Sequence, residues 1–337
     1  MIIGGFDTAQ RPLLIAELGN NHEGDPALAL HLADAAVEAG ADAVKVQVID
    51  PPRLVNVSQA ERIAQLTRFR LDREVFLEMA RRVRNRGRLF MASVFDCASL
   101  VGMIGDLDAI KIASGDLDFD EMLELAAGSG KPIVLSTGMS TMQEIVRSVR
   151  VISEALPPGT SVTTQLAVLH CVSLYPAPLE SANLAAIRTM AAKLQVTIGY
   201  SDHTLGIAAA LLALSLGARV IEKHFTLDKN RSGFRDHALS ADPTEFAALA
   251  QAVHKFDEML GTGDRDEIGP DAVNRALARR SVVAARDLVA GTVLQPGDLD
   301  CVRPAGGVPP SGARRLIGRR LLAARAAHQT ITLMDVE

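Results

Sequence analysis

The sequence predicts a (β/α)8 TIM barrel followed by a small, β-rich C-terminal domain. Short apolar runs alternate with helical patterns from residue 13 to residue 260, which is typical of a parallel sheet covered by helices. The length of 337 residues suits a barrel of about 250 residues with a small addition. No Gly-x-Gly-x-x-Gly follows the first strand, so the pattern does not favour a dinucleotide-binding fold.

Eight apolar runs are expected to form the strands of this barrel. In chain order they are 13–19, 43–48, 89–93, 109–114, 132–137, 166–172, 198–204 and 220–225. The first helix should begin with Asp25 as N-cap and Pro26 as first residue, and end at Gly40. Asp72 should cap a later helix, and residues 206–217 should form another.

The composition changes abruptly after the last expected helix, 243–260. We therefore expect a barrel domain over residues 1–262, a linker over 263–280 and a C-terminal domain over 281–337. That last domain is at the small end of independent stability, so it should pack on the barrel or on a second subunit.

The bulk properties point to a soluble, reduced, cytoplasmic protein. A net charge of −5 gives no support for a nucleic-acid or anionic-membrane partner. Cys97, Cys171 and Cys301 share no metal-binding or redox spacing, and an odd count argues against a disulfide framework. Residues 1–5 lack the pattern of a signal peptide, and the most apolar run, 206–217, is too short to span a bilayer.

Two histidines end consecutive strands of the expected barrel. His203 closes the strand 198–204 and His224 closes 220–225, with a helix between them. Such strand–helix–strand units place their strands parallel and adjacent, so both imidazoles should lie at the C-terminal edge of the sheet. A pair of neutral imidazoles suits a borderline divalent cation. Because a histidine at a strand end is often structural, spacing alone leaves a metal pair and two structural histidines open.

The remaining strand ends carry an unusual number of polar groups for strands this apolar. These are Glu17, Lys45, Gln47, Ser93, Lys111, Ser114, Ser136, Thr137, Ser173, Tyr175, Ser201 and Glu222. Two lysines among hydroxyls suit a phosphate or carboxylate, unless Lys45 and Lys111 only form ion pairs with Glu17 and Asp116. An anion site beside a metal site suits the joining of a phosphorylated three-carbon acid to an aldehyde.

Several segments of this chain resemble the sialic acid (N-acetylneuraminate) synthase family. The matching segments are IAELGNNHEG (15–24), KVQ (45–47), KIASG (111–115), LSTGM (135–139), LHC (169–171) with Tyr175-Pro176, SDHT (201–204) and EKHFT (222–226). The C-terminal part is similar to that family's antifreeze-protein-like (SAF) domain, through Gly291, Asp298-Leu299 and Arg303-Pro304. The resemblance runs from about residue 13 to the end.

The resemblance implies that phosphoenolpyruvate condenses with an N-acetylated hexosamine, giving a nine-carbon 2-keto-3-deoxy acid and inorganic phosphate. It places Mn²⁺, or Mg²⁺ or Co²⁺ instead, on His203 and His224, and it puts Glu17 beside the metal-bound water that attacks C2. It assigns phosphoenolpyruvate to Lys45, Ser93, Lys111, Ser114, Ser136 and Ser201. It assigns the sugar to Gln47, Ser173, Tyr175, Glu222 and Asp236. It further implies a homodimer whose C-terminal domains are swapped, with Arg303 reaching the N-acyl group in the partner's site.

Two departures from the family lie where the sugar is recognised. Ser173 stands where the sialic acid enzymes usually carry Asn, and their Gly-Pro-Asp turn is one residue longer here, at 233–236. The acceptor therefore stays open between N-acetylmannosamine and the diacetamido sugars of legionaminic or pseudaminic acid.

Other functions fit parts of the same pattern. A metal-dependent aldolase or isomerase on this barrel would need the histidine pair but no phosphoenolpyruvate. The six- and eight-carbon sugar-phosphate condensing enzymes are closer siblings, but their acceptors carry a phosphate, which requires further basic groups. A carbohydrate- or ice-binding module on an inert barrel would not need the polar cluster at the strand ends.

Overall fold

The computed structural model describes residues 1–264 and 269–337, which form two compact units, Met1–Leu260 and Gly261–Glu337. We call these the barrel unit and the C-terminal unit. The expected linker, 263–280, includes residues 265–268, which lie outside the described residues, and also the helix α14 (Asp271–Ala278).

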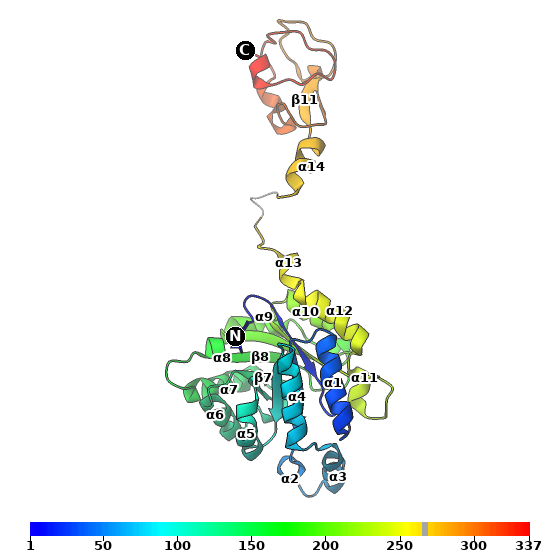
Figure 1. Ribbon diagram of the computed structural model, residues 1–337. Coiled ribbons are helices and arrows are strands. Elements are labelled where there is room, and N and C mark those ends of the chain that lie inside the picture. Colours follow the sequence, from blue (N-terminus) through cyan, green and yellow to red (C-terminus); the bar gives the residue numbers. More distant parts are fainter. Residues whose placement is uncertain (265–268) are drawn as a thin grey trace. The chain divides into compact units, whose positions relative to one another are not determined.

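Parallel strands close into a barrel in the first unit, as predicted (Figure 1). Among residues 1–264, eight strands pair in the closed order β10-β3-β4-β5-β6-β7-β8-β9. They are β3 (Leu13–Glu17), β4 (Ala43–Val48), β5 (Leu89–Val94), β6 (Ala109–Ile112), β7 (Ile133–Ser136), β8 (Leu166–Cys171), β9 (Thr197–Asp202) and β10 (Val220–His224). All eight predicted runs are therefore strands, each ending within a few residues of its expected end.

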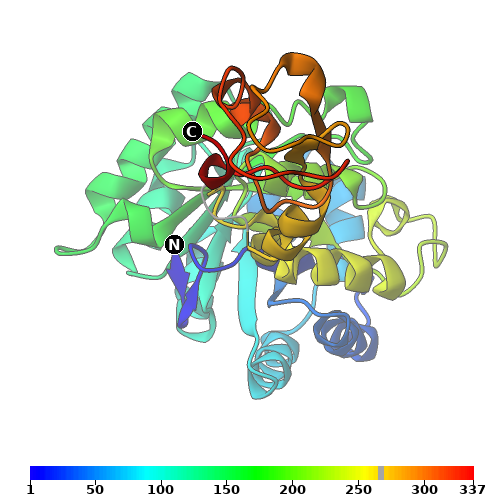
Figure 2. The same ribbon diagram turned by 90° about the horizontal axis from the view of Figure 1, so that it is seen from above.

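Helices surround the strands on the outside (Figure 1, Figure 2). They are α1 (Pro26–Glu38), α2 (Pro51–Leu54), α3 (Ala60–Phe69), α4 (Arg73–Asn85), α5 (Cys97–Met103), α6 (Asp120–Gly128), α7 (Met142–Ala155), α8 (Val162–Gln165), α9 (Ala186–Leu194), α10 (Ala208–Ser215), α11 (Arg235–Leu239), α12 (Pro243–His254) and α13 (Phe256–Leu260). Asp25 caps α1, as expected, by accepting hydrogen bonds from the backbone amides of residues 27 and 28. The single helix expected over 243–260 is instead two helices, because α12 ends at His254, with Lys255 as its C-cap, and α13 begins at Phe256.

The barrel unit has one apolar layer inside the strands and another between strands and helices. The inner layer takes alternate residues of each strand, such as Leu13 and Ile15 of β3 and Val220 of β10. The next residues along the same alternation are Glu17 and Glu222, which are polar and buried. Because side chains of a strand alternate between faces, these residues share the inside of the barrel. The inside is therefore apolar toward the N-terminal ends of the strands and polar at their C-terminal ends.

An N-terminal hairpin packs on the inner layer. It consists of β1 (Ile2–Ile3) and β2 (Phe6–Asp7) in antiparallel pairing. Met1 and Ile3 are buried with the inner apolar residues, and the Met1 amine donates to Thr197 Oγ1 at 2.9 Å, at the start of β9. The hairpin therefore covers the N-terminal end of the barrel, opposite the polar end.

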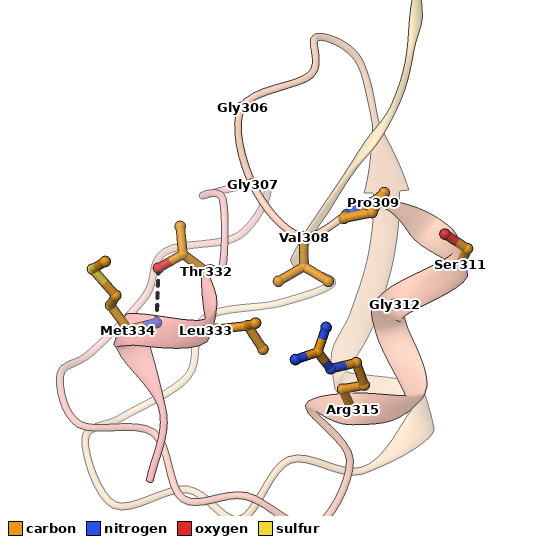
Figure 3. Close-up of a pocket in the computed structure, with 10 residues that line it drawn as sticks. All are labelled: Gly306, Gly307, Val308, Pro309, Ser311, Gly312, Arg315, Thr332, Leu333 and Met334. Atoms are coloured by element: carbon orange, nitrogen blue, oxygen red, sulfur yellow. Dashed lines mark hydrogen bonds between the residues drawn. The ribbon is translucent and has the colours of Figure 1, made fainter. Parts of the chain in front are cut away.

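The C-terminal unit has a small antiparallel sheet of β11 (Ser281–Ala284) and β12 (Leu299–Val302). A short 3-10 turn, η4 (Pro296–Asp298), lies between these strands, and two more follow them, η5 (Pro310–Arg315) and η6 (Leu333–Asp335). Thr330 forms an isolated antiparallel bridge with Val283, and the chain turns into η6 at Leu333. A hollow of about 590 Å³ opens beside η6, and Val308, Leu333 and Arg315 point toward one another across it (Figure 3).

No helix within residues 1–264 and 269–337 is both long enough and apolar enough to cross a bilayer.

Candidate active site

A cavity of about 320 Å³ lies at the C-terminal ends of the barrel strands. Thirteen of the predicted site residues line it: Glu17, Lys45, Gln47, Ser93, Lys111, Ser114, Ser136, Ser173, Tyr175, Ser201, His203, Glu222 and His224. The polar strand ends therefore converge, as expected from the rule that barrel chemistry gathers at this face.

The strand register explains why these side chains meet. Glu17 of β3 pairs with His224 of β10 on one side and with Lys45 of β4 on the other. Ser93 of β5 pairs with Lys111 of β6, one strand further along the barrel. Residues in register on parallel neighbours point to the same face, so these groups form a continuous polar ring inside the barrel mouth.

Two lysines and two carboxylates form a buried ionic cluster in this ring. Lys45 Nζ lies 2.9 Å from Glu17 Oε2 and 3.3 Å from Glu222 Oε1. Lys111 Nζ lies 3.8 Å from Glu222 Oε2 and donates to Ser136 Oγ at 2.7 Å. The alternative in which the lysines form ion pairs predicted Lys45 with Glu17, and this pair is present. It predicted Lys111 with Asp116, but Lys111 lies beside Glu222 instead. Glu222, which the resemblance assigns to the sugar, lines the cavity between the two lysines.

Burial and neighbouring charge set the protonation of this cluster. Burial raises the pKa of Glu222, but Lys111, Lys45 and His224 together outweigh it and lower that pKa to about 2. Burial lowers the pKa of Lys45, yet Glu17 and Glu222 raise it above its usual value. Burial lowers the pKa of Lys111. Burial raises the pKa of Glu17, although the attraction of Lys45 opposes the rise. Glu17 is therefore the more basic of the two carboxylates.

The two predicted imidazoles lie side by side at the cavity wall. The ring centroids of His203 and His224 are 5.4 Å apart. Burial, the largest cause in each case, lowers the pKa of both rings to about 4, so both are neutral at pH 7. His203 Nδ1 lies 2.8 Å from the carbonyl oxygen of Val172, which can only accept, so Nδ1 carries the proton and Nε2 keeps its lone pair.

Free nitrogen lone pairs on both rings fit a metal ion bound by two protein ligands. His224 Nδ1 is buried and has no hydrogen-bond partner among the described residues. Within those residues no group of three or more His, Cys, Asp or Glu side chains is arranged to hold a metal. The ion's other ligands would therefore come from water or substrate oxygens.

A buried ion pair fixes the ends of the two strands that carry the imidazoles. Lys223 Nζ lies 3.0 Å from Asp202 Oδ2 and donates to the carbonyl oxygen of Thr204 at 2.5 Å. Asp202 in turn accepts from the backbone amide of Thr204 at 2.8 Å. All three residues are buried, so the ends of β9 and β10 are held together next to His203 and His224.

Two predicted residues do not line the cavity. Asp236 is buried, is the second residue of α11, and accepts from Arg235 Nε at 3.2 Å. Arg303 lies in the C-terminal unit, exposed at the end of β12, and does not line the hollow of that unit. Arg303 was expected to act in a partner's site, which the structure of a single chain does not contain.

Sequence reasoning missed several cavity residues, which are Phe95, Ala113, Gly115, Met139, Cys171 and Arg235. Cys171 was available from the inward alternation of β8, since Ala167 and Leu169 belong to the inner apolar layer. Arg235 gave no periodic signal because it lies in the connection after β10. Its guanidinium carbon lies 4.8 Å above the ring of Tyr175, whose ring centroid is 4.2 Å from that of His203.

Comparison with known proteins agrees with this architecture. The NeuB family pattern matches residues 32–265, and the SAF domain pattern matches residues 279–337. The N,N'-diacetyllegionaminic acid synthase of Legionella pneumophila is 38% identical, over 96% of this chain and 94% of that protein. The N-acetylneuraminate-9-phosphate synthase of Homo sapiens is 30% identical, over 97% of this chain and 94% of that protein.

A solved structure gives the same result for the barrel. The N-acetylneuraminic acid (sialic acid) synthetase of Leptospira borgpetersenii, crystallised with citrate, matches with a TM-score of 0.75 at 32% identity. The match covers 81% of this chain and 94% of that chain. The chain therefore belongs to the NeuB family, as an enzyme related to the synthases of sialic, legionaminic and pseudaminic acids, and it carries a SAF domain at its C-terminal end.

Proposed function

We propose that this enzyme condenses phosphoenolpyruvate with an N-acyl hexosamine to give a nine-carbon 2-keto-3-deoxy acid and inorganic phosphate. C3 of phosphoenolpyruvate forms the new bond to the aldehyde carbon, water adds at C2, and phosphate leaves as C2 becomes a ketone. The observation that carries the proposal is that one cavity contains two buried lysines and, on its other side, two neutral imidazoles. This gives an anion site next to a carbonyl-activating site.

The lysine side of the cavity suits phosphoenolpyruvate. Lys45 and Lys111 supply fixed positive charge, and Ser93 Oγ and Ser136 Oγ lie 3.3 and 2.7 Å from their respective ammonium groups. Ser114 and Ser201 add hydroxyl donors from the neighbouring strand ends. Hydroxyls turn to follow an oxyanion while ammonium groups hold its charge, so this set binds the phosphate and carboxylate of one small anion.

The imidazole side suits a divalent cation. We take the ion to be Mn²⁺, with Mg²⁺ or Co²⁺ as alternatives, because the resemblance to the family implies that order. His203 and His224 would hold the ion, and when bound it polarises the aldehyde oxygen of the acceptor. The Val172 carbonyl orients the His203 ring and selects the tautomer that presents Nε2.

Glu17 is the residue placed to handle the proton of the attacking water. Gln47 Nε2 donates to Glu17 Oε1 at 2.9 Å, and Lys45 fixes the other oxygen. Burial raises its pKa, which makes its carboxylate a stronger base than an exposed glutamate. In this proposal Glu17 orients the water and accepts its proton, while Gln47, Ser173 and Tyr175 contact the sugar.

The proposal includes a homodimer in which the SAF domain of one chain reaches the barrel of the other. Arg303 then contacts the N-acyl group of the sugar in the partner's site. Its support is the exposure of Arg303 together with the match of residues 279–337 to the SAF domain.

Phosphate release measured with purified protein tests the proposed reaction. We expect release that requires both phosphoenolpyruvate and an N-acyl hexosamine, from a panel of N-acetylmannosamine and diacetamido-6-deoxy hexoses, and that stops with a chelator. His31→Ala, an exposed histidine of α1, is the matched control for His224→Ala. Sugar cleavage without phosphoenolpyruvate would instead identify a metal-dependent aldolase, and release without any sugar would contradict a condensation.

A further inference from the structure

A buried asparagine lies in the turn after β3 and has no role in the proposed reaction. Asn20 is 6% exposed. The backbone amide of Asn21 closes its turn by donating to the carbonyl oxygen of Leu18 at 3.0 Å, and the amide of Leu18 donates to the carbonyl oxygen of Lys45 at 2.9 Å. The turn is therefore attached to β4, the strand that also carries Gln47.

Asn20 is connected to Glu17 through one intervening side chain. Asn20 Nδ2 lies 3.1 Å from Gln47 Oε1, and Gln47 Nε2 lies 2.9 Å from Glu17 Oε1. Lys45 Nζ lies 2.9 Å from the other oxygen, Glu17 Oε2. The carboxylate of Glu17 is thus held at both of its oxygens, on one side by an ammonium group and on the other by the Gln47 amide.

The carboxylate of Glu17 fixes the direction of both hydrogen bonds. An ionised carboxylate can only accept, so Gln47 must present Nε2 to it. The Oε1 atom of Gln47 then faces Asn20, which must present Nδ2. Turning either amide would bring two oxygens or two amino groups face to face, so the three side chains form one ordered chain of hydrogen bonds.

Asn20 is the anchor of the Gln47 amide. Within residues 1–264 and 269–337, Gln47 Oε1 accepts from Asn20 alone, and Gln47 Nε2 donates to Glu17 alone. Gln47 also lines the active-site cavity, whereas Asn20 does not. Without Asn20, the long side chain of Gln47 is free to turn away from Glu17 into the open space of the cavity.

The next residue shows what a structural asparagine does in this turn. Asn21 Nδ2 donates to the carbonyl oxygen of Phe225 at 2.8 Å and to Ser240 Oγ at 3.0 Å. These partners follow β10 and α11 and do not line the cavity, so Asn21 joins the turn to the barrel wall. Asn20 Oδ1, by contrast, has no hydrogen-bond partner among the described residues. The bond to Gln47 is therefore the contact that the Asn20 side chain makes.

We propose that Asn20 is a positioning residue of the active site, which holds the carboxylate of Glu17 toward the attacking water through the amide of Gln47. Asn20 itself does not touch the substrate. This inference rests on the proposed function, because the proposed function assigns the attacking water to Glu17.

Two substitutions close to asparagine in volume test Asn20 as a hydrogen-bond donor. Asn20→Leu removes the donor, and Asn20→Asp puts an acceptor in its place, which turns the Gln47 amide and brings its oxygen toward Glu17. We expect kcat for phosphate release to fall about tenfold in Asn20→Leu, which corresponds to one hydrogen bond in the transition state, and at least as far in Asn20→Asp. The KM for phosphoenolpyruvate should stay within about twofold of the wild-type value, because the lysines and serines that bind it keep their contacts. A packing role predicts wild-type kcat in both variants, and this result would overturn the inference.

A double-mutant cycle separates positioning from a general structural effect. Gln47→Leu already releases Glu17, so adding Asn20→Leu should lower kcat no further. The control is Asn21→Leu, which has no link to Gln47, so its effect on kcat should multiply with that of Gln47→Leu. Multiplying effects of Asn20→Leu and Gln47→Leu would overturn the inference. A change confined to the KM for phosphoenolpyruvate would overturn it too, and both outcomes would leave the proposed reaction standing.

A crystal structure of Asn20→Leu keeps the inference testable if wild type releases no phosphate with any acceptor. That result would refute the proposed function, and the structure would then decide about the positioning role. We expect Gln47 Nε2 to have left Glu17 Oε1 while Lys45 still contacts Oε2. Asn20→Ala replaces this variant if leucine prevents folding. A Gln47 amide that still donates to Glu17 in the variant would show that Asn20 does not hold it.

Discussion

Replacing Glu222 by Gln removes one charge from the buried ionic cluster and keeps the shape of the side chain. Glu222 lies 3.3 Å from Lys45 and 3.8 Å from Lys111, and it accepts from Ser201 Oγ at 3.0 Å. In Glu222→Gln the two buried ammonium groups face only Glu17. Breaking a buried pair by removing one partner is costly because the remaining charge is left uncompensated.

The pKa of Glu222 gives the size of this effect. Its surroundings lower that pKa from 4.5 to about 2, which corresponds to about 3 kcal/mol of folding stability at neutral pH. Because the folded pKa lies below the unfolded one, the contribution is fully present above pH 4.5 and is lost as the pH falls through about 2. The loss of folding stability in Glu222→Gln should therefore be large at pH 7 and less than about half as large at pH 3.

Urea unfolding followed by circular dichroism measures this difference, with a chelator present in every sample. The control is Glu124→Gln, an exposed glutamate of α6 that has no ion pair among the described residues, and it should change stability by less than about 0.5 kcal/mol. Equal stability of Glu222→Gln and the control at pH 7 would refute the assigned ion pairing. So would a difference that does not shrink in acid.

Three further changes test the metal site, the partner contact and the barrel packing. His224→Ala should abolish turnover and weaken Mn²⁺ binding in calorimetry. It should leave the thermal unfolding of the chelator-treated protein unchanged. Full activity of the chelator-treated variant would contradict the metal role. Arg303→Ala should raise the KM for the sugar far more than the KM for phosphoenolpyruvate, and an unchanged sugar KM would count against the swapped dimer. Gly199→Ala should destabilise the barrel by about 3 kcal/mol, because a Cβ there would lie 2.4 Å from both Leu169 Cδ2 and the carbonyl oxygen of Val220. Gly105→Ala, where a Cβ would meet nothing within 4 Å, should unfold like wild type in the same denaturation experiment.

The strands and the composition of the cavity could be predicted because both depend on local pattern. A parallel strand buried on both faces requires a continuous apolar run, and all eight such runs are strands. A polar residue at the end of such a run must find partners at the barrel mouth. For this reason Glu17, Lys45, Lys111 and Glu222 were found from the sequence as a set.

Other features are outside the reach of local pattern. The N-terminal hairpin is too short to show periodicity, and it is stable only because the barrel offers an apolar end to cover. Arg235 is a second example, since nothing in the sequence places the start of α11 at the wall of the cavity.

The sequence by itself determined the barrel, the SAF domain and the types of side chain at the strand ends, because the alternation of two residues along each strand decides which side chains face inward. Only the tertiary structure decided which of these groups are in contact. The pairing of Lys111 with Glu222 rather than Asp116, and the position of Glu222 between both lysines, depend on how β4, β6 and β10 face one another across the closed barrel. Barrel closure fixes these distances, and no spacing along the chain encodes them.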